Sequence, residues 1–180
     1  WTDRSTCILF GDGAGAVLLK RVEWGKPLGV MSTHIYSDGS LSDLICVPGG
    51  IGKSGINKDD IDDKKYFIKM SGNATFKVAV KRMADVIREA LKFNDLSMEE
   101  VSLLIPHQAN ERIISAVADR LKYPLEKVFM NIQKYGNTSA ASIPIGINEA
   151  RRSGRIEPGD TTVLGSVGAG LTWGSAVIKW

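Results

Sequence analysis

The sequence contains few of the residues that mark metal-binding, disulfide-bonded or membrane proteins. It has two cysteines and two histidines in 180 residues. Cys7 and Cys46 each lie in an apolar stretch and lack the spacing of metal ligands or of a disulfide framework, which argues against both kinds of site. No apolar run approaches the ~18 residues that span a bilayer, and no charged and then apolar leader is present. These absences predict a cytoplasmic protein that does not enter the membrane.

The charge of the chain is nearly balanced. Its formal net charge is +3, from 23 basic and 20 acidic residues, which is too small to indicate nucleic-acid binding. The hydrophobic content of 43% is enough for a buried core. The chain begins with Trp1 and runs directly into a strand-like segment, so we expect it to be a fragment of a longer protein.

Apolar periodicity predicts alternating strands and helices, which is typical of an α/β fold. Helices are expected over 72–93, after His107, and from about 138 to 153, where Pro144 should kink the helix unless it begins later. Between 48 and 65 the chain is rich in glycine, lysine and aspartate, which predicts a mobile loop or an insertion. The expected strands are 6–10, 17–19, 28–36, 41–47, 66–70, 101–105, 128–132, 161–166 and 172–180.

Two glycine-rich turns lie between apolar runs, one at each end of the chain. The first, GDGAGA at 11–16, superficially fits a dinucleotide-binding fingerprint, but no amphipathic helix follows it, so a tight turn is the favoured interpretation. The second is Gly168-Ala169-Gly170. Their similar settings hint at a duplicated half-fold.

His107 is the strongest candidate for chemistry. It follows the apolar segment Leu104 to Pro106 and precedes a helical segment, which places it in a strand-to-helix loop, where open α/β sheets usually have their sites. A buried structural histidine is the alternative. Asn137 also precedes a helix, and helix N-termini favour negative charge. If these two loops converge with the turn at 168–170, they form a suitable place to stabilise an oxyanion.

Five segments together resemble a known family: GDGAGA at 11–16, MSGNATFKVAV at 70–80, IPHQANERII at 105–114, YGNTSAASIP at 135–144 and GLTWGSAVIKW at 170–180. They are similar to β-ketoacyl-acyl carrier protein synthase III, a member of the thiolase-like superfamily. The resemblance covers nearly the whole chain except 48–65. It implies the C-terminal half of a thiolase-like fold, a mixed five-stranded sheet flanked by helices, over 27–180. Residues 1–26 would be the last strands of the N-terminal half.

The family's reaction is the decarboxylative Claisen condensation of a short acyl-CoA with malonyl-acyl carrier protein, which initiates fatty-acid synthesis. The resemblance implies that His107 and Asn137 are the last two members of a Cys-His-Asn triad and hold the enolate as neutral donors. Neither Cys7 nor Cys46 matches the nucleophile, so we expect the isolated chain to be inactive. No cofactor is implied beyond substrates linked to CoA and to phosphopantetheine.

The resemblance also implies roles for other positions. The backbone N–H of Ala169 would complete an oxyanion hole. The implied partners are acyl-CoA, the acyl carrier protein, the N-terminal half of the same enzyme and a second subunit of a homodimer. Contacts with CoA or pantetheine are implied for Arg4, Asn73, Ala109 and Asn110, and contacts with the carrier protein for Lys77, Gln108, Ala109, Asn110, Glu111 and Arg112. Two alternatives remain: another thiolase-like condensing enzyme of secondary metabolism, and a non-catalytic fragment that binds CoA and the carrier protein.

Overall fold

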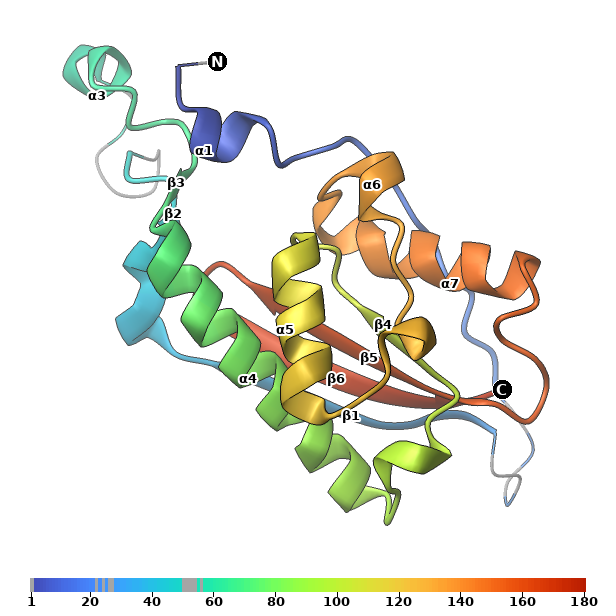
Figure 1. Cartoon of the computed structure of the whole chain (residues 1–180). Coiled ribbons are helices and arrows are strands. Elements are labelled where there is room, and N and C mark those ends of the chain that lie inside the picture. Colours follow the sequence, from blue (N-terminus) through green and yellow to red (C-terminus); the bar gives the residue numbers. More distant parts are fainter. Residues whose placement is uncertain (1, 22, 24, 26–27, 50–54, 56) are drawn as a thin grey trace.

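A four-stranded mixed sheet forms the centre of the computed structural model (Figure 1), which describes residues 2–21, 23, 25, 28–49, 55 and 57–180. The strand order is β1-β6-β5-β4, with β6 antiparallel to both neighbours and β4 parallel to β5. The four strands are β1 (Gly29–Ser37), β4 (Leu103–Pro106), β5 (Thr161–Gly168) and β6 (Thr172–Lys179). A separate two-stranded sheet pairs β2 (Ile45–Cys46) with β3 (Lys69–Met70).

Helices cover both faces of the main sheet, as the alternation along β4 shows. Leu104 belongs to the larger core cluster with residues of α4 (Gly72–Phe93) and α5 (Glu111–Leu121). Leu103 and Ile105 point to the other face and pack in a second cluster. That second cluster includes Ala150 of α7 (Ser142–Arg152), so α7 lies across the sheet from α4 and α5.

A close approach between α4 and β5 depends on a glycine. A Cβ on Gly165 would lie 2.8 Å from Cδ1 of Ile87 and 3.2 Å from Cγ of Met83, both fully buried on α4. A larger residue at this position would force the side chain of Ile87 to shift. Glycine therefore allows α4 to pack closely against the inner part of β5.

The remaining elements are short. The turns of 3-10 helix are η1 (Gly39–Leu44), η2 (Met98–Glu100), η3 (Leu125–Lys127) and η4 (Ser139–Ala141), and the short α-helices are α1 (Arg4–Cys7), α3 (Lys58–Asp62) and α6 (Ile132–Tyr135). Within the part of the chain that the structure describes, no helix is both long and apolar enough to cross a bilayer.

The longer predicted elements are confirmed. α4 has the predicted bounds, and β1, β5 and β6 cover their predicted segments within about two residues at each end. α7 begins at Ser142, later than the sequence suggested. Pro144 is therefore in its first turn, where a missing backbone N–H costs no intrahelical hydrogen bond.

The predicted fifth strand is wrong. Segment 128–132 makes one isolated parallel bridge among the described residues, between Val128 and Leu104, and Phe129 N–H donates to the Leu104 carbonyl at 2.8 Å. Beyond this hydrogen bond, the side chain of Gln108, rather than a backbone strand, makes the hydrogen bonds to the segment. It donates to the Phe129 carbonyl at 3.1 Å and accepts the Asn131 N–H at 3.0 Å.

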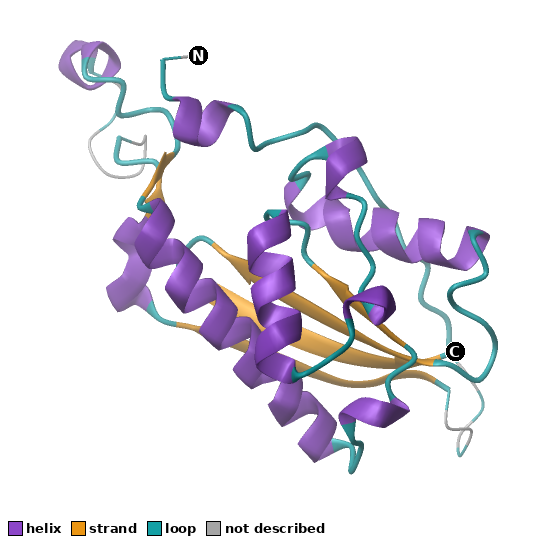
Figure 2. Cartoon of the chain, in the orientation of Figure 1, coloured by secondary structure: helices purple, strands orange, loops and turns teal. Residues whose placement is uncertain are grey.

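The strands predicted at 6–10 and 17–19 are also wrong. Residues Arg4–Cys7 form α1, and the described part of the segment between α1 and β1 is loop apart from one bridge between Phe10 and Asn137 (Figure 2). Leu18 is 95% exposed, and its apolar neighbours Val17 and Leu19 are exposed as well. An apolar strand needs partner strands, and the described residues provide none for this segment.

The segment between β1 and α4 contains less strand than predicted. Most of 41–47 is the 3-10 turn η1, and only the last two residues of 66–70 pair as β3. The loop predicted over 48–65 contains α3, whose first turn is capped by the side chain of Asn57. Residues 50–54 and 56 of that loop, and the domain boundary predicted at Lys26, lie outside the described residues.

Candidate functional site

His107 lies where β4 ends. Its backbone N–H donates to the carbonyl of Gly165 on β5 at 2.7 Å, which extends the β4–β5 pairing by one residue. Three residues later the side chain of Asn110 accepts the N–H of Ile113 at 2.9 Å and begins α5. The predicted strand-to-helix loop is therefore present, with His107 held at its strand end.

His107 is 9% exposed, and the Nδ1 of its imidazole lies 2.7 Å from the hydroxyl of Ser142 in α7. Burial lowers the pKa of His107 to about 4, although a backbone hydrogen bond with Ser139 acts in the opposite direction. The ring is therefore neutral at pH 7. A neutral imidazole has one N–H donor and one acceptor nitrogen.

Asn137 is fixed through its backbone by the N-terminal segment. Its N–H donates to Leu9 O at 2.9 Å, and its carbonyl accepts from Gly11 N–H at 2.9 Å. A Cβ on Gly11 would lie 2.0 Å from the Tyr135 carbonyl oxygen, so glycine is required for this approach. The side-chain Oδ1 of Asn137 accepts the Ser139 N–H at 2.9 Å. The amide NH₂ is the polar end that remains for a ligand.

One cavity of about 640 Å³ brings these loops together. His107, Ala109 and Asn110 line it from the β4–α5 loop, Asn137 from the loop before α7, and Ala169 from the turn between β5 and β6. The convergence of three loops that the sequence suggested is therefore present. The rest of the wall is largely apolar, with Phe10, Ile35, Met70, Ile113 and Trp173 among its residues. A largely apolar cavity with a few convergent polar groups is typical of a site for a small ligand.

The other predicted site residues do not line this cavity. Arg4 is exposed in α1, which contacts β3. Four of them are exposed near the N-terminal ends of two helices: Asn73 and Lys77 in the first two turns of α4, and Glu111 and Arg112 in the first turn of α5. The same helices contribute Thr75 and Ile113 to the cavity wall. The guanidinium of Arg112 lies over the ring of Phe76, 5.7 Å from its centre, and so links the two helices at this end.

Gln108 differs from its implied role. The resemblance suggested contact with a carrier protein, but the side chain is 1% exposed and offers no surface to a partner. Its amide donates to the Pro106 and Phe129 carbonyls and accepts from Asn131 N–H. The physical reason is that these backbone groups lie at the edge of the sheet, where no described strand pairs with them. Buried backbone groups need hydrogen-bond partners, and the Gln108 side chain provides them.

Sequence reasoning missed Ser142 and Cys46 as residues near the site. The contact of Ser142 with His107 joins positions 35 residues apart, and no periodic pattern signals such a pair. Cys46 of β2 lines the same cavity as His107 and Asn137. The sequence indicated only a small buried hydrophobic residue there, but the cysteine is half-buried.

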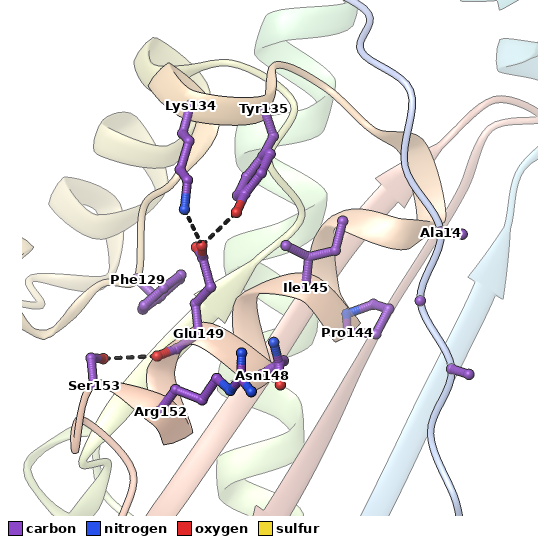
Figure 3. A pocket seen from close by; sticks show the side chains of 12 residues that line it. Ala14, Phe129, Lys134, Tyr135, Pro144, Ile145, Asn148, Glu149, Arg152 and Ser153 are labelled. Atoms are coloured by element: carbon purple, nitrogen blue, oxygen red, sulfur yellow. Dashed lines mark hydrogen bonds and ion pairs between the residues drawn. The ribbon is translucent and has the colours of Figure 1, made fainter.

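A second cavity, of about 740 Å³, lies between α7 and residues 14–16 (Figure 3) and contains none of the predicted site residues. Glu149 is its central acid. Its carboxylate accepts hydrogen bonds from Lys134 at 2.7 Å, Tyr135 at 2.6 Å and Asn131 at 2.8 Å. These bonds, that of Lys134 above all, lower the pKa of Glu149 to about 2. This cluster ties α6 to α7 immediately before Asn137 and leaves little of the carboxylate for chemistry.

The α/β fold, a mixed sheet with helices on both faces, is that of the thiolase-like proteins. The family described as 3-Oxoacyl-[acyl-carrier-protein (ACP)] synthase III C terminal matches residues 91–180, and 3-Oxoacyl-[acyl-carrier-protein (ACP)] synthase III matches residues 1–39. The chain belongs to the 3-oxoacyl-[acyl-carrier-protein] synthase III family.

Individual relatives agree with this assignment. The β-ketoacyl-[acyl-carrier-protein] synthase III of Alkalilimnicola ehrlichii is 48% identical over 180 residues, which are the whole of this chain and 54% of that protein. The crystal structure of the Aquifex aeolicus synthase III matches with a TM-score of 0.85 and 47% identity over 99% of this chain and 52% of that one. The structure from Pseudomonas aeruginosa matches with a TM-score of 0.87 and 39% identity, with the same coverage. The chain thus spans about half the length of these relatives.

Proposed function

We propose that this chain supplies the histidine and asparagine of a condensing enzyme that joins a short acyl-CoA to malonyl-acyl carrier protein and so initiates fatty-acid synthesis. The observation that carries the proposal is that His107 and Asn137, which are 30 residues apart in the sequence, line one cavity. The names of the relatives support this choice of reaction.

In the proposed reaction, a cysteine thiol attacks the acyl-CoA thioester, and CoA leaves as its thiol. Malonyl-carrier protein then loses CO₂, and the electron pair of the broken bond forms an enolate. The enolate carbon attacks the acyl-cysteine, the cysteine sulfur leaves, and a β-ketoacyl-carrier protein results. The cysteine belongs to the part of the relatives that this chain does not match.

His107 and Asn137 act on the enolate. Decarboxylation places negative charge on the thioester oxygen, and a neutral imidazole N–H together with the amide NH₂ of Asn137 can stabilise it. The low pKa of His107 supports this role because the ring stays neutral and can remain a donor without taking a proton from solvent. The backbone N–H of Ala169, a residue that lines the same cavity, would stabilise the oxyanion formed on the acyl group.

CoA and the acyl carrier protein would approach the cavity at the N-terminal ends of α4 and α5. Asn73, Ala109 and Asn110 would contact pantetheine, and Arg4 the nucleotide end of CoA. Lys77, Glu111 and Arg112 are exposed near the same end, and the two cations suit an acidic carrier protein.

We place residues 27–180 in the C-terminal half of the thiolase-like fold and residues 1–26 in its N-terminal half. The whole enzyme would be a homodimer in the cytoplasm.

A chimera tests this function directly. The matching segment of the Aquifex aeolicus relative is replaced by this chain, and formation of β-ketoacyl-carrier protein from acetyl-CoA and malonyl-carrier protein is measured. We expect a folded chimera to be active and to prefer short acyl-CoA over long. A folded chimera without activity would contradict the proposal and would favour a non-catalytic binding role, whereas a preference for long acyl groups would favour a different condensing enzyme.

The isolated chain is the second arm of that experiment. We expect it to show no condensation, because it lacks the nucleophile of the parent reaction. Cys46 makes this arm informative because it lines the cavity with His107. Activity of the isolated chain that disappears in Cys46→Ala would show that this cysteine is the nucleophile and that our assignment to the N-terminal half is wrong.

A further inference from the structure

A row of neighbouring residues crosses the main sheet where the sheet meets the cavity of His107. Ser166 of β5 pairs with Gly174 of β6, and Gly174 pairs with Ile35 of β1. On the other side of Ser166, His107 directly follows the last pair between β4 and β5, and its backbone N–H donates to the Gly165 carbonyl. Ile35, Gly174, Ser166 and His107 all line the cavity. The row therefore forms part of its wall.

Within this row, Ser166 and His107 point to the same face of the sheet. Leu164, two residues before Ser166, packs in the core cluster on the α7 side, and side chains alternate along a strand, so Ser166 points to that side too. His107 faces α7 as well, since its imidazole contacts Ser142. Neighbouring strands lie about 4.8 Å apart. A small ligand that contacts the imidazole can therefore also reach the hydroxyl of Ser166.

Hydroxyl groups line the cavity at four described positions, and two of these groups are used within the protein. Thr75 and Thr172 each donate to a backbone carbonyl at 3.2 Å. The hydroxyls of Ser139 and Ser166 make no hydrogen bond with other described residues. Ser139 is exposed, whereas Ser166 is half-buried beside His107. Since half-buried hydroxyls usually have a partner, Ser166 has a hydroxyl available to a ligand that His107 also contacts.

The described residues that line the cavity are uncharged at pH 7. They include no lysine, arginine, aspartate or glutamate, and His107 is neutral. A carboxylate that enters the cavity must therefore be held by neutral donors, such as hydroxyl or amide groups. Malonyl-carrier protein brings a carboxylate of this kind, attached to the carbon next to the thioester carbonyl.

We propose that the hydroxyl of Ser166 donates a hydrogen bond to the carboxylate of the malonyl group and so helps to bind this substrate. The inference rests on the proposed function, in which His107 and Asn137 hold the thioester oxygen of the same group. Because Ser166 is the neighbour of His107 on the next strand, the thioester oxygen and the nearby carboxylate each have a donor.

A neutral donor suits a carboxylate that has to leave. Decarboxylation breaks the bond between the carboxylate carbon and the methylene carbon, CO₂ departs, and the electron pair of that bond forms the enolate. The hydrogen bond from Ser166 is therefore strongest in the bound substrate and is lost as the charge moves away. It favours substrate binding without accelerating the chemical step. A cation at this position would hold the carboxylate more strongly and would oppose its loss.

Ligand binding to the unmodified 180-residue chain tests the proposal without any turnover. Isothermal titration calorimetry gives the dissociation constants of malonyl-CoA and of acetoacetyl-CoA, which has a methyl ketone in place of the carboxylate. In Ser166→Ala the ratio of the first constant to the second should rise about tenfold, because a hydrogen bond to a charged group is lost. An unchanged ratio, or no binding of malonyl-CoA to the unmodified chain, overturns the proposal.

Ser139→Ala is the matched variant, because it removes the other cavity hydroxyl that has no partner in the described part of the chain. We expect it to leave the ratio of the two dissociation constants unchanged. A larger change in Ser139→Ala than in Ser166→Ala would assign the carboxylate to Ser139 and would overturn the proposal.

In the chimera, Ser166→Ala should raise the KM for malonyl-carrier protein about tenfold, without lowering kcat and without changing the KM for acetyl-CoA. A KM that rises for acetyl-CoA instead would place Ser166 at the acyl group and overturn the proposal. The binding measurement needs no activity. A chimera that proves inactive with Ser166 in place would therefore count against the proposed function, whereas an unchanged ratio in the chain would count against Ser166 alone.

Discussion

The side-chain oxygen of Gln108 accepts the backbone N–H of Asn131 at 3.0 Å, so a side chain finishes the sheet edge where a fifth strand was predicted. The amide nitrogen of the same residue donates to the carbonyls of Pro106 and Phe129. One buried amide thus fixes the path of the chain on both sides of His107 and on the way to Asn137.

Replacing Gln108 by alanine should destabilise the chain by about 3 kcal/mol, because several buried backbone groups would lose their partner. Urea unfolding followed by circular dichroism measures the change. The chain has one other glutamine, the exposed Gln133, and Gln133→Ala should change the stability by less than about 0.5 kcal/mol. Equal effects in the two variants would show that Gln108 does not support the sheet edge.

The stability of the chain should fall as the pH drops from 6.5 towards 4, partly because of His107. Its pKa is lowered from 6.5 to about 4 by burial, so over this range the unfolded chain binds a proton that the folded chain does not. The effect amounts to about 3 kcal/mol at the lower end. In His107→Asn the free energy of unfolding should fall less between pH 6.5 and 4. In His34→Asn the part of this fall that comes from His107 should be unchanged. Parallel curves for His107→Asn and the original chain would contradict the burial of a neutral ring.

Glu149 should affect stability in a different pH range. Its pKa is lowered from 4.5 to about 2, so its stabilising effect is complete above pH 4.5 and is lost as the pH falls towards 2. Glu149→Gln should lower the stability at pH 7 by about 1 to 2 kcal/mol. Its unfolding free energy should also depend less on pH below 4.5. The exposed Glu126→Gln is the control, and an equal response of the two variants would argue against the α6–α7 link.

The isolated chain should associate in solution. Its N-terminal segment exposes Ile8, Val17, Leu18 and Leu19, and such apolar runs favour self-association. Light scattering coupled to size exclusion should show oligomers or aggregates of the chain, and Leu18→Lys together with Leu19→Lys should reduce them. A monodisperse monomer of the unmodified chain at high concentration is the contrary result.

The sequence predicted the elements whose stabilising pattern is local. α4 was predicted to the residue because its apolar side, with Met83 and Ile87, repeats through a long helix. A helix after His107 was expected as well, and the structure has α5 there, capped by Asn110. The loops before two helices suggested that His107 and Asn137 could converge, and the motif resemblance implied that they act together. Both residues line one cavity.

The parts that could not be predicted depend on contacts between distant residues. The side chain of Gln108 forms hydrogen bonds with the backbone of Phe129 and Asn131, which lie more than 20 residues away in the sequence. The position of that segment depends on the folded chain and not on a local sequence pattern. Segment 6–19 has the composition of strands, but strands need partners that the described residues do not provide. Ser142 was missed because a serine in a polar motif is usually a helix cap.

In the proposed reaction His107 and Asn137 stabilise the same oxygen, and a double-mutant cycle in the chimera measures whether they do. Each of His107→Ala and Asn137→Ala should lower kcat for condensation by roughly 10²- to 10³-fold, as loss of an oxyanion donor does. Because both donors would act on one atom, we predict that the double variant loses less than the product of the two factors. If either single variant is correctly folded and retains nearly full kcat, that residue does not stabilise the enolate oxygen.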